Sequence, residues 1–144
     1  MAEPASACVF CEILAGRLPS SVVYHDDLCT AFLDIQPVNP GHILVVPNKH
    51  FAGLAELPPD TGAHLFRAAQ PLAAALRRSG ARCEGVDVFL ADGAAAGQEV
   101  FHVHLHVIPR FAHDGFGFRF SPAYDHPPER AELNTIAEQI RQVL

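Results

Sequence analysis

The sequence predicts an α+β domain: a mainly antiparallel, five-stranded sheet with one long helix, a short N-terminal helix and a C-terminal helix. Three observations lead to this fold class. Five short segments have the apolar pattern of strands, and turn residues such as Gly, Pro and Asp separate them. Apolar stripes at helical spacing occupy residues 58–80 and the C-terminal region. Strands and helices do not alternate along the chain as they would in a parallel sheet, so neighbouring strands are expected to be antiparallel.

Length and composition favour one domain over 1–144, with a core at about 8–110 and a C-terminal extension at 111–144. Apolar residues make up 49% and charged residues 18%, as in ordinary soluble proteins. No apolar run is long enough to span a bilayer, which argues against a membrane protein. Residues 1–4 lack the basic and apolar parts of a secretory signal, so we expect a cytoplasmic location.

The formal net charge is -6, which argues against nucleic acid as a partner, because such binding needs many Lys and Arg residues to neutralise phosphates. Any phosphate must therefore be bound locally. The nine histidines make this plausible, since imidazoles donate hydrogen bonds without making the whole surface basic.

The N-terminal half predicts one helix and three strands. Val9, Phe10, Ile13 and Leu14 repeat at helical spacing, and Gly16 follows as a C-terminal cap. The three strands are expected at 22–24, 30–33 and 42–46, the last one ending at Pro47.

The C-terminal half predicts the long helix, two strands and the terminal helix. The long helix opens at Pro58 and Pro59 and ends at Gly80, and a strand follows at 86–90. The Phe- and Gly-rich stretch 111–122 is expected to form an edge strand or a lid. From Pro127 and Pro128 onward an amphipathic helix is expected to pack on the domain or on a second subunit; its apolar stripe is Leu133, Ile136, Ile140 and Val143.

The segment Phe101–Arg110 places three histidines at alternate positions. On a β-strand, successive side chains point to opposite faces, so His102, His104 and His106 would share one face. Pro109 is expected to end the strand because it has no N–H to donate. The opposite face would be buried, with Val103, Leu105 and Val107.

Such a cluster has three interpretations. The first is a run of hydrogen-bonded core histidines with no chemical role. In the second, all three bind a catalytic zinc ion that keeps an open position. In the third, the imidazoles divide nucleophilic and hydrogen-bonding roles among themselves.

Cys8 and Cys11 form a Cys-x-x-Cys pair, whereas Cys29 and Cys83 are expected to be inert small hydrophobes. A reducing compartment disfavours structural disulfides. A redox role would require a βαβ unit before the pair, and none is present, so zinc is preferred if two further ligands exist. Otherwise Cys8 and Cys11 are only hydrophobes that flank a helix.

The run from His102 to Ile108 resembles the signature of the histidine-triad (HIT) nucleotide hydrolases and transferases. The approach to it is also similar to that family, through Asp92-Gly93, Ala96-Gly97-Gln98 and Val100. The resemblance extends from about Cys8 to Arg110. It implies the HIT fold and a homodimer that pairs through the long helix and the sheet edge.

The resemblance also implies a structural zinc site of the kind found in one branch of this superfamily. There, a Cys pair is completed by a histidine after the strand that ends in Pro and by the first triad histidine. In this sequence the implied ligands are Cys8, Cys11, His50 and His102.

For catalysis, the resemblance implies that His104 attacks the α-phosphorus of a nucleotide derivative and forms a covalent nucleotidyl-histidine, which water cleaves to release AMP or another NMP. His42 and His106 are expected to donate hydrogen bonds to the non-bridging phosphate oxygens, as are Gln98 and backbone groups near Gly97. The sequence has no phosphate-binding Gly-x-x-x-x-Gly-Lys loop and no evident acidic pair for magnesium, so we expect chemistry without a required metal cofactor.

Positions that match the family's nucleoside pocket are expected to bind an adenine nucleotide, with Asp34 accepting hydrogen bonds from the ribose hydroxyls. Taken singly, the apolar members of this set are as consistent with ordinary core packing. The full set is Val9, Phe10, Ile13, Phe32, Asp34 and Ile35.

Two positions depart from the phosphoramidase branch, which usually has Asn where this chain has Ala91 and Ser where it has Glu99. Asp92-Gly93 and Ile108-Pro109-Arg110 look closer to the dinucleoside polyphosphate hydrolases. The leaving group is therefore open between an amine and a polyphosphate. The alternative function is a nucleotide-binding or scaffold protein without useful turnover.

Overall fold

The structure, a computed structural model, describes residues 8–144, which form two units divided between Asp114 and Gly115. Residues 1–4, on which the expectation of no secretory signal rests, lie outside the described residues. None of the helices within residues 8–144 is long and apolar enough to cross a bilayer.

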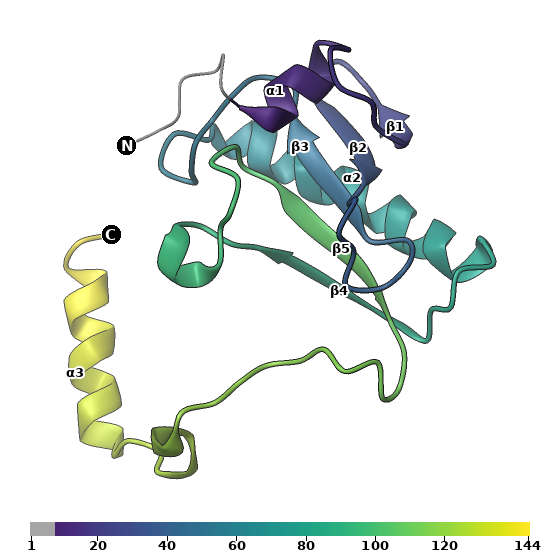
Figure 1. Cartoon of the computed structure of the whole chain (residues 1–144). Coiled ribbons are helices and arrows are strands. Elements are labelled where there is room, and N and C mark those ends of the chain that lie inside the picture. Colours follow the sequence, from purple (N-terminus) through teal and green to yellow (C-terminus); the bar gives the residue numbers. More distant parts are fainter. Residues whose placement is uncertain (1–7) are drawn as a thin grey trace. The chain divides into compact units, whose positions relative to one another are not determined.

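The first unit contains a five-stranded sheet in the order β1-β2-β3-β5-β4, and each neighbouring pair is antiparallel (Figure 1). This confirms the predicted fold class. The strand bounds are β1 Val22–His25, β2 Cys29–Leu33, β3 Ile43–Pro47, β4 Gly85–Leu90 and β5 Leu105–Arg110.

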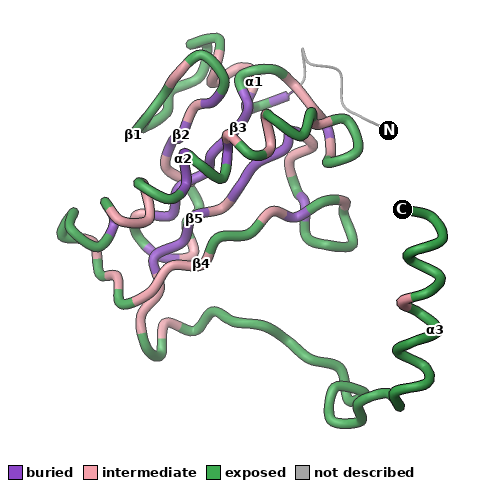
Figure 2. The backbone as a smooth tube through the Cα atoms, turned by 180° about the vertical axis from the view of Figure 1, so that it is seen from behind, coloured by how far each residue is buried: buried purple, intermediate pink, exposed green. Residues whose placement is uncertain are grey.

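Two helices cover opposite faces of this sheet: the short α1 (Val9–Leu14) and the long α2 (Pro59–Arg78). Alternate residues of β3 divide between the two resulting cores. Ile43 and Val45 pack on the side of α2, whereas Leu44 and Val46 pack on the side of α1. Because both faces of β3 are covered, the strand is apolar without interruption. Figure 2 shows this concentration of buried residues in the central strands.

The histidine-bearing segment is the main departure from the predicted strands. The ladder between β3 and β5 begins at the pair Val45 and Leu105, so only His106 of the three histidines lies within a strand. His102 and His104 lie in the preceding segment, where the Val103 N–H donates to the Phe51 carbonyl at 2.8 Å. The expected alternation still holds, because Val103, Leu105 and Val107 all lie in the core beneath α2.

The sequence predicted that Pro109 would end the strand, but it does not. It pairs with Val86 of β4, and β5 continues to Arg110. The pairing of β5 with β3 extends only to Val107. Pro109 therefore lies where β5 has a strand neighbour on one side only, a position that tolerates a missing N–H.

In the second unit, residues 115–121 contain no strand, and neither do residues 111–114 before them, so the expected edge strand is absent. A short 3₁₀ helix spans Pro122–Asp125, and α3 spans Arg130–Arg141. No residue of α3 is buried within the described chain. Its apolar stripe, predicted from the sequence, is thus exposed along the helix.

Candidate active site and metal cluster

The loop between β4 and β5 is held by a buried glutamine. Gly93 and Gly97 have φ values of +91° and +92°, in the left-handed region that favours glycine. Gln98 follows Gly97 directly in the sequence. Its side-chain amide nitrogen donates to the carbonyls of Ala52 (2.8 Å) and Val100 (3.1 Å), and its side-chain oxygen accepts the Gly93 N–H at 2.8 Å. Both amide hydrogens are engaged, so this geometry does not support the expectation that Gln98 donates to phosphate. Gln98 instead positions the loop.

His104 is buried, and its ring orientation is fixed by the backbone. Its Nδ1 lies 2.7 Å from the carbonyl oxygen of His102. A carbonyl only accepts hydrogen bonds, so Nδ1 carries the proton and Nε2 keeps its lone pair. The Phe10 ring packs edge-on against His104, with centroids 5.2 Å apart. Burial lowers the pKa of His104, which keeps the ring neutral near pH 7.

His106 takes part in a chain of hydrogen bonds that sets its tautomer. The Val38 N–H donates to Nδ1 of His42 at 3.1 Å, and Nε2 of His42 lies 2.9 Å from Nδ1 of His106. Because Nδ1 of His42 accepts, its Nε2–H donates, and the remaining proton of His106 sits on Nε2. Burial lowers the pKa of His106 to about 3 and also lowers that of His42, so both rings stay neutral.

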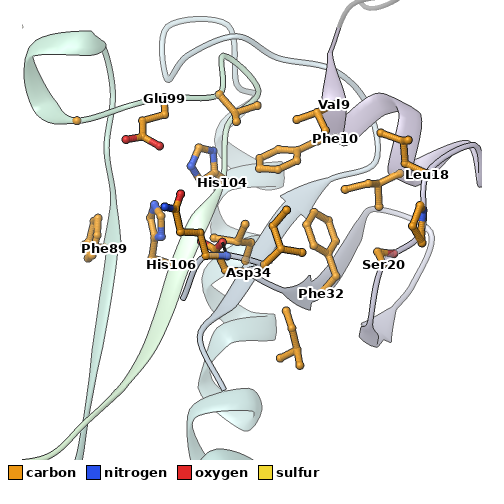
Figure 3. Close-up of a pocket in the computed structure, with 18 residues that line it drawn as sticks. Val9, Phe10, Leu18, Ser20, Phe32, Asp34, Phe89, Glu99, His104 and His106 are labelled. Carbon is orange, nitrogen blue, oxygen red and sulfur yellow. Dashed lines mark hydrogen bonds between the residues drawn. The ribbon is translucent and has the colours of Figure 1, made fainter. Parts of the chain in front are cut away.

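A cavity of about 560 Å³, within the size range of small-molecule sites, lies beside these histidines (Figure 3). The predicted residues that line it are Val9, Phe10, Ile13, Phe32, Asp34, Ile35, Gly97, His104 and His106.

Two predicted residues, Gln98 and His42, do not line the cavity. His42 is only 3% exposed and lies behind His106, so its predicted contact with phosphate is replaced by support of the His106 ring. Asp34 faces the cavity, with one oxygen accepting the Gln36 N–H at 2.8 Å. Its second oxygen lies 3.8 Å from Nδ1 of His42.

Phe89 and Glu99 are two of the lining residues that were not assigned a site role from the sequence. Phe89 of β4 stacks on His106, with centroids 4.4 Å apart and planes inclined by 19°. Its position follows from the strand register, which pairs Phe89 with His106. Glu99, noted above only as a departure, also lines the cavity. An antiparallel pairing of 85–90 with 105–110 would have predicted the Phe89 contact, but the sequence does not specify that register.

The four predicted metal ligands come together in the structure. The potential ligand atoms of Cys8, Cys11, His50 and His102 all lie within 4.8 Å of one another. Nδ1 of His102 is 3.4 Å from Sγ of Cys8 and 3.6 Å from Sγ of Cys11, and Nδ1 of His50 is 3.4 Å from Sγ of Cys11.

The chemistry of this cluster fits a tetrahedral zinc ion. Nε2 of His102 donates to the Pro47 carbonyl at 2.9 Å, which leaves Nδ1 free to coordinate. Burial and the adjacent Cys8 thiol raise the pKa of Cys11 to about 11, so a cation would be needed to hold its thiolate. Nε2 of His50 is buried without a hydrogen-bond partner among the described residues.

The geometry does not support a catalytic zinc bound by all three triad histidines. His102 turns Nδ1 to the cysteines, and His106 turns Nδ1 to His42. Within residues 8–144, no group of potential ligands contains His102, His104 and His106 together.

Known proteins are similar in sequence to this chain over most of its length. A HIT-like protein of Borreliella burgdorferi is 45% identical over 113 residues, which cover 78% of this chain and 81% of the relative. Adenylylsulfatase HINT3 of Arabidopsis thaliana is 36% identical over 107 residues, 74% of this chain and 54% of that protein.

Solved structures of similar proteins share the fold, and one of them is described as zinc-bound. A HIT family protein from Bacillus subtilis has a TM-score of 0.86 at 37% identity, covering 96% of this chain and 97% of its own. A zinc-bound histidine triad protein from Mycobacterium smegmatis has a TM-score of 0.75 at 36% identity, covering 98% and 100%. The HIT domain family matches residues 15–113, and the chain therefore belongs to the HIT family.

Proposed function

We propose that the protein hydrolyses nucleoside 5′-phosphate derivatives at the α-phosphorus, with His104 as the nucleophile. One observation carries this proposal. The Nδ1–H of His104 is held by the His102 carbonyl, so the unprotonated nitrogen of this cavity residue is Nε2. A neutral imidazole in this tautomer attacks without first losing a proton.

The reaction has two displacements at the same phosphorus. Nε2 of His104 forms a bond to the α-phosphorus while the bond to the leaving group breaks, and the leaving group departs with that electron pair. An amine leaving group also takes a proton from solvent. Water then attacks the phosphorus, the P–N bond to His104 breaks, and the nucleoside monophosphate and a solvent proton are released.

His106 is the side chain that donates to the phosphate during these steps. Its Nε2–H is the one ring proton not used by the chain of hydrogen bonds from Val38 through His42. A fixed donor near a non-bridging oxygen stabilises charge that shifts in the transition state. His42 acts through His106 and is a positioning residue.

The nucleoside is expected at the apolar end of the cavity. Phe10 and Phe32 pack edge to face, with centroids 5.4 Å apart, and with Val9 and Ile13 they offer an apolar surface for a base. Asp34 also lines the cavity, and its carboxylate is expected to accept hydrogen bonds from the ribose hydroxyls. We propose adenine as the base.

We propose that Cys8, Cys11, His50 and His102 hold one structural zinc ion. The ion would neutralise the two thiolates and connect α1 to the segment that carries His104. It takes no part in the bond changes. His102 would then bind the metal with its ring and orient His104 with its carbonyl oxygen.

A product assay tests the proposal. The protein is incubated with an adenosine phosphoramidate, diadenosine tetraphosphate and, because one relative is an adenylylsulfatase, adenylyl sulfate, and AMP is measured. We expect AMP from at least one compound and a loss of more than about a thousandfold in His104→Ala. His25→Ala, at an exposed histidine of β1, is the matched control and should keep full activity.

Two results would contradict the proposal. Undiminished hydrolysis by His104→Ala would exclude His104 as the nucleophile. Tight binding of nucleotides without release of AMP from any compound would instead favour a non-catalytic nucleotide-binding protein.

A further inference from the structure

The cavity is acidic where a nucleotide hydrolase must accept an anion. Asp34 and Glu99 line it, and none of its lining residues, all within the described chain, is Lys or Arg. Its histidines add no compensating charge, because burial lowers the pKa of His104 and His106. The resting cavity therefore carries two negative charges.

Glu99 lies at the end of the cavity that the leaving group must occupy. Figure 3 shows Glu99 with Phe89 and His106 at one end, and Val9, Leu18 and Phe32 at the other. If the base occupies the apolar end and His104 attacks between the two, the leaving group departs toward Glu99.

The charge of Glu99 has no partner within the described residues. Its side chain is exposed, and neither a hydrogen bond nor an ion pair joins it to another described residue. Glu99 is nevertheless near enough to His104 to act on it electrostatically. A carboxylate in this position is available to interact with whatever group leaves the phosphorus.

We propose that Glu99 selects substrates by the charge of the leaving group, favouring amines that carry a cationic substituent over anionic groups such as polyphosphates. This rests on the proposed hydrolysis and names its substrate class: nucleoside 5′-phosphoramidates with a positively charged amine side chain. The P–N bond breaks, and the amine departs with the bonding electron pair and a proton from solvent.

Electrostatics sets both the direction and the size of the effect. The α-phosphate is common to all substrates, so its repulsion by Glu99 cancels in a comparison. A polyphosphate brings several further negative charges to the same end, whereas a cation there gains an attraction. Exposed pairs are weak and screened by salt over about 8 Å, so we expect about a three- to tenfold preference at physiological ionic strength.

The test uses three AMP amides that differ mainly in side-chain charge. Their amines are ethylenediamine (cationic), propylamine (neutral) and β-alanine (anionic), and kcat/KM and Kd are measured for each. Wild type is compared with Glu99→Gln, which removes only the charge, with Glu99→Asp, which keeps it, and with Asp27→Asn. Asp27 is an exposed carboxylate outside the cavity lining, so its loss changes net charge alone.

We expect the cation-to-anion ratio to fall about three- to tenfold in Glu99→Gln and to persist in Glu99→Asp and Asp27→Asn. The ratio should also fall as salt is raised. An unchanged ratio in Glu99→Gln, or an equal fall in Asp27→Asn, would overturn the role of Glu99. If no amide is hydrolysed, the proposed hydrolysis is contradicted. The ratios of the Kd values for the three amides still test whether Glu99 selects substrates by charge.

Discussion

Each histidine around the cavity has one ring nitrogen committed to a fixed partner, which decides what the other nitrogen can do. His104 uses Nδ1 as a donor to a carbonyl and keeps Nε2 as a base. His106 accepts at Nδ1 from His42 and keeps Nε2–H as a donor. The proposed nucleophile and the proposed phosphate donor therefore differ in tautomer, although they are two residues apart.

Removing His42 should weaken catalysis without removing a substrate contact. In His42→Ala, Nδ1 of His106 loses its donor, the ring is free to choose the other tautomer, and kcat should fall about ten- to a hundredfold with little change in KM. His42→Gln, whose amide can donate to His106, should recover part of the loss. A large rise in KM with kcat unchanged would place His42 in substrate binding instead.

The buried imidazoles should also make the protein less stable in acid. Burial lowers the folded-state pKa of His106 to about 3 and lowers that of His42, while both titrate near 6.5 when unfolded. The unfolded chain then binds more protons below pH 6.5, so stability is full above that pH and is lost as pH falls toward the folded pKa values. Thermal unfolding at pH 7 and pH 5 should show this loss, and His106→Asn should lessen it. An equal pH dependence in that variant would exclude His106 as a source.

The role of a residue was predictable from the sequence where it follows from residue type and spacing. It was not predictable where it depends on how deeply the side chain is buried. His104 and Asp34 line the cavity as expected. Gln98 and His42 were expected beside the phosphate, yet neither lines the cavity: Gln98 donates to backbone carbonyls, and His42 donates to the His106 ring. A polar side chain that satisfies buried backbone groups has the same sequence signal as one that binds a ligand.

At the scale of elements, the proposed zinc site joins three segments that are distant in sequence. Cys8 and Cys11 flank the start of α1, His50 follows β3, and His102 precedes β5. The α1 helix has only six residues and is too short to be stable alone. Zinc would thus fix α1, and with it Phe10, against the site.

Removing the metal should therefore loosen the cavity. We expect about one zinc per chain by elemental analysis of protein prepared without chelator, and a lower Tm and weaker nucleotide binding after chelation. Cys11→Ser should reproduce these changes, whereas Cys83→Ser, at a cysteine outside the cluster, should not. Protein without zinc that keeps the same Tm and activity would rule out this role.

The helices and four of the strands were predictable to within a few residues because their periodicities reflect burial on one or both faces. The exception is the triad segment, which was predicted as a strand over its whole length. Apolar alternation persists through Val103 and Leu105, but strand pairing with β3 begins only at Leu105. Side-chain alternation reports which face is buried, whereas a strand also requires a partner's backbone, which the sequence does not show.

At the scale of the whole molecule, α3 of the second unit bears on the oligomeric state of the protein. Leu133, Ile136 and Ile140 of α3 are 38%, 44% and 55% exposed within the chain, an apolar stripe of the kind that usually meets a partner. We propose a homodimer, as the family resemblance implies. Light scattering after size-exclusion chromatography should give twice the chain mass.

If α3 contributes to that dimer, a charge on its apolar stripe should weaken it. Ile136→Asp with Ile140→Asp should shift the protein toward monomer, whereas Asn134→Asp, on the polar side of α3, should leave the dimer intact. A monomeric wild type would contradict the homodimer. A dimer unaffected by the double substitution would place the interface elsewhere.

The central claim is that the α-phosphorus passes through a bond to His104, and the stereochemical course at that phosphorus tests it most directly. Hydrolysis of a substrate made chiral at the α-phosphorus, in isotopically labelled water, gives a product whose configuration can be assigned. Two in-line displacements, through His104 and then water, predict net retention of configuration. Net inversion would mean that water attacks the substrate directly, and it would contradict the nucleotidyl-histidine.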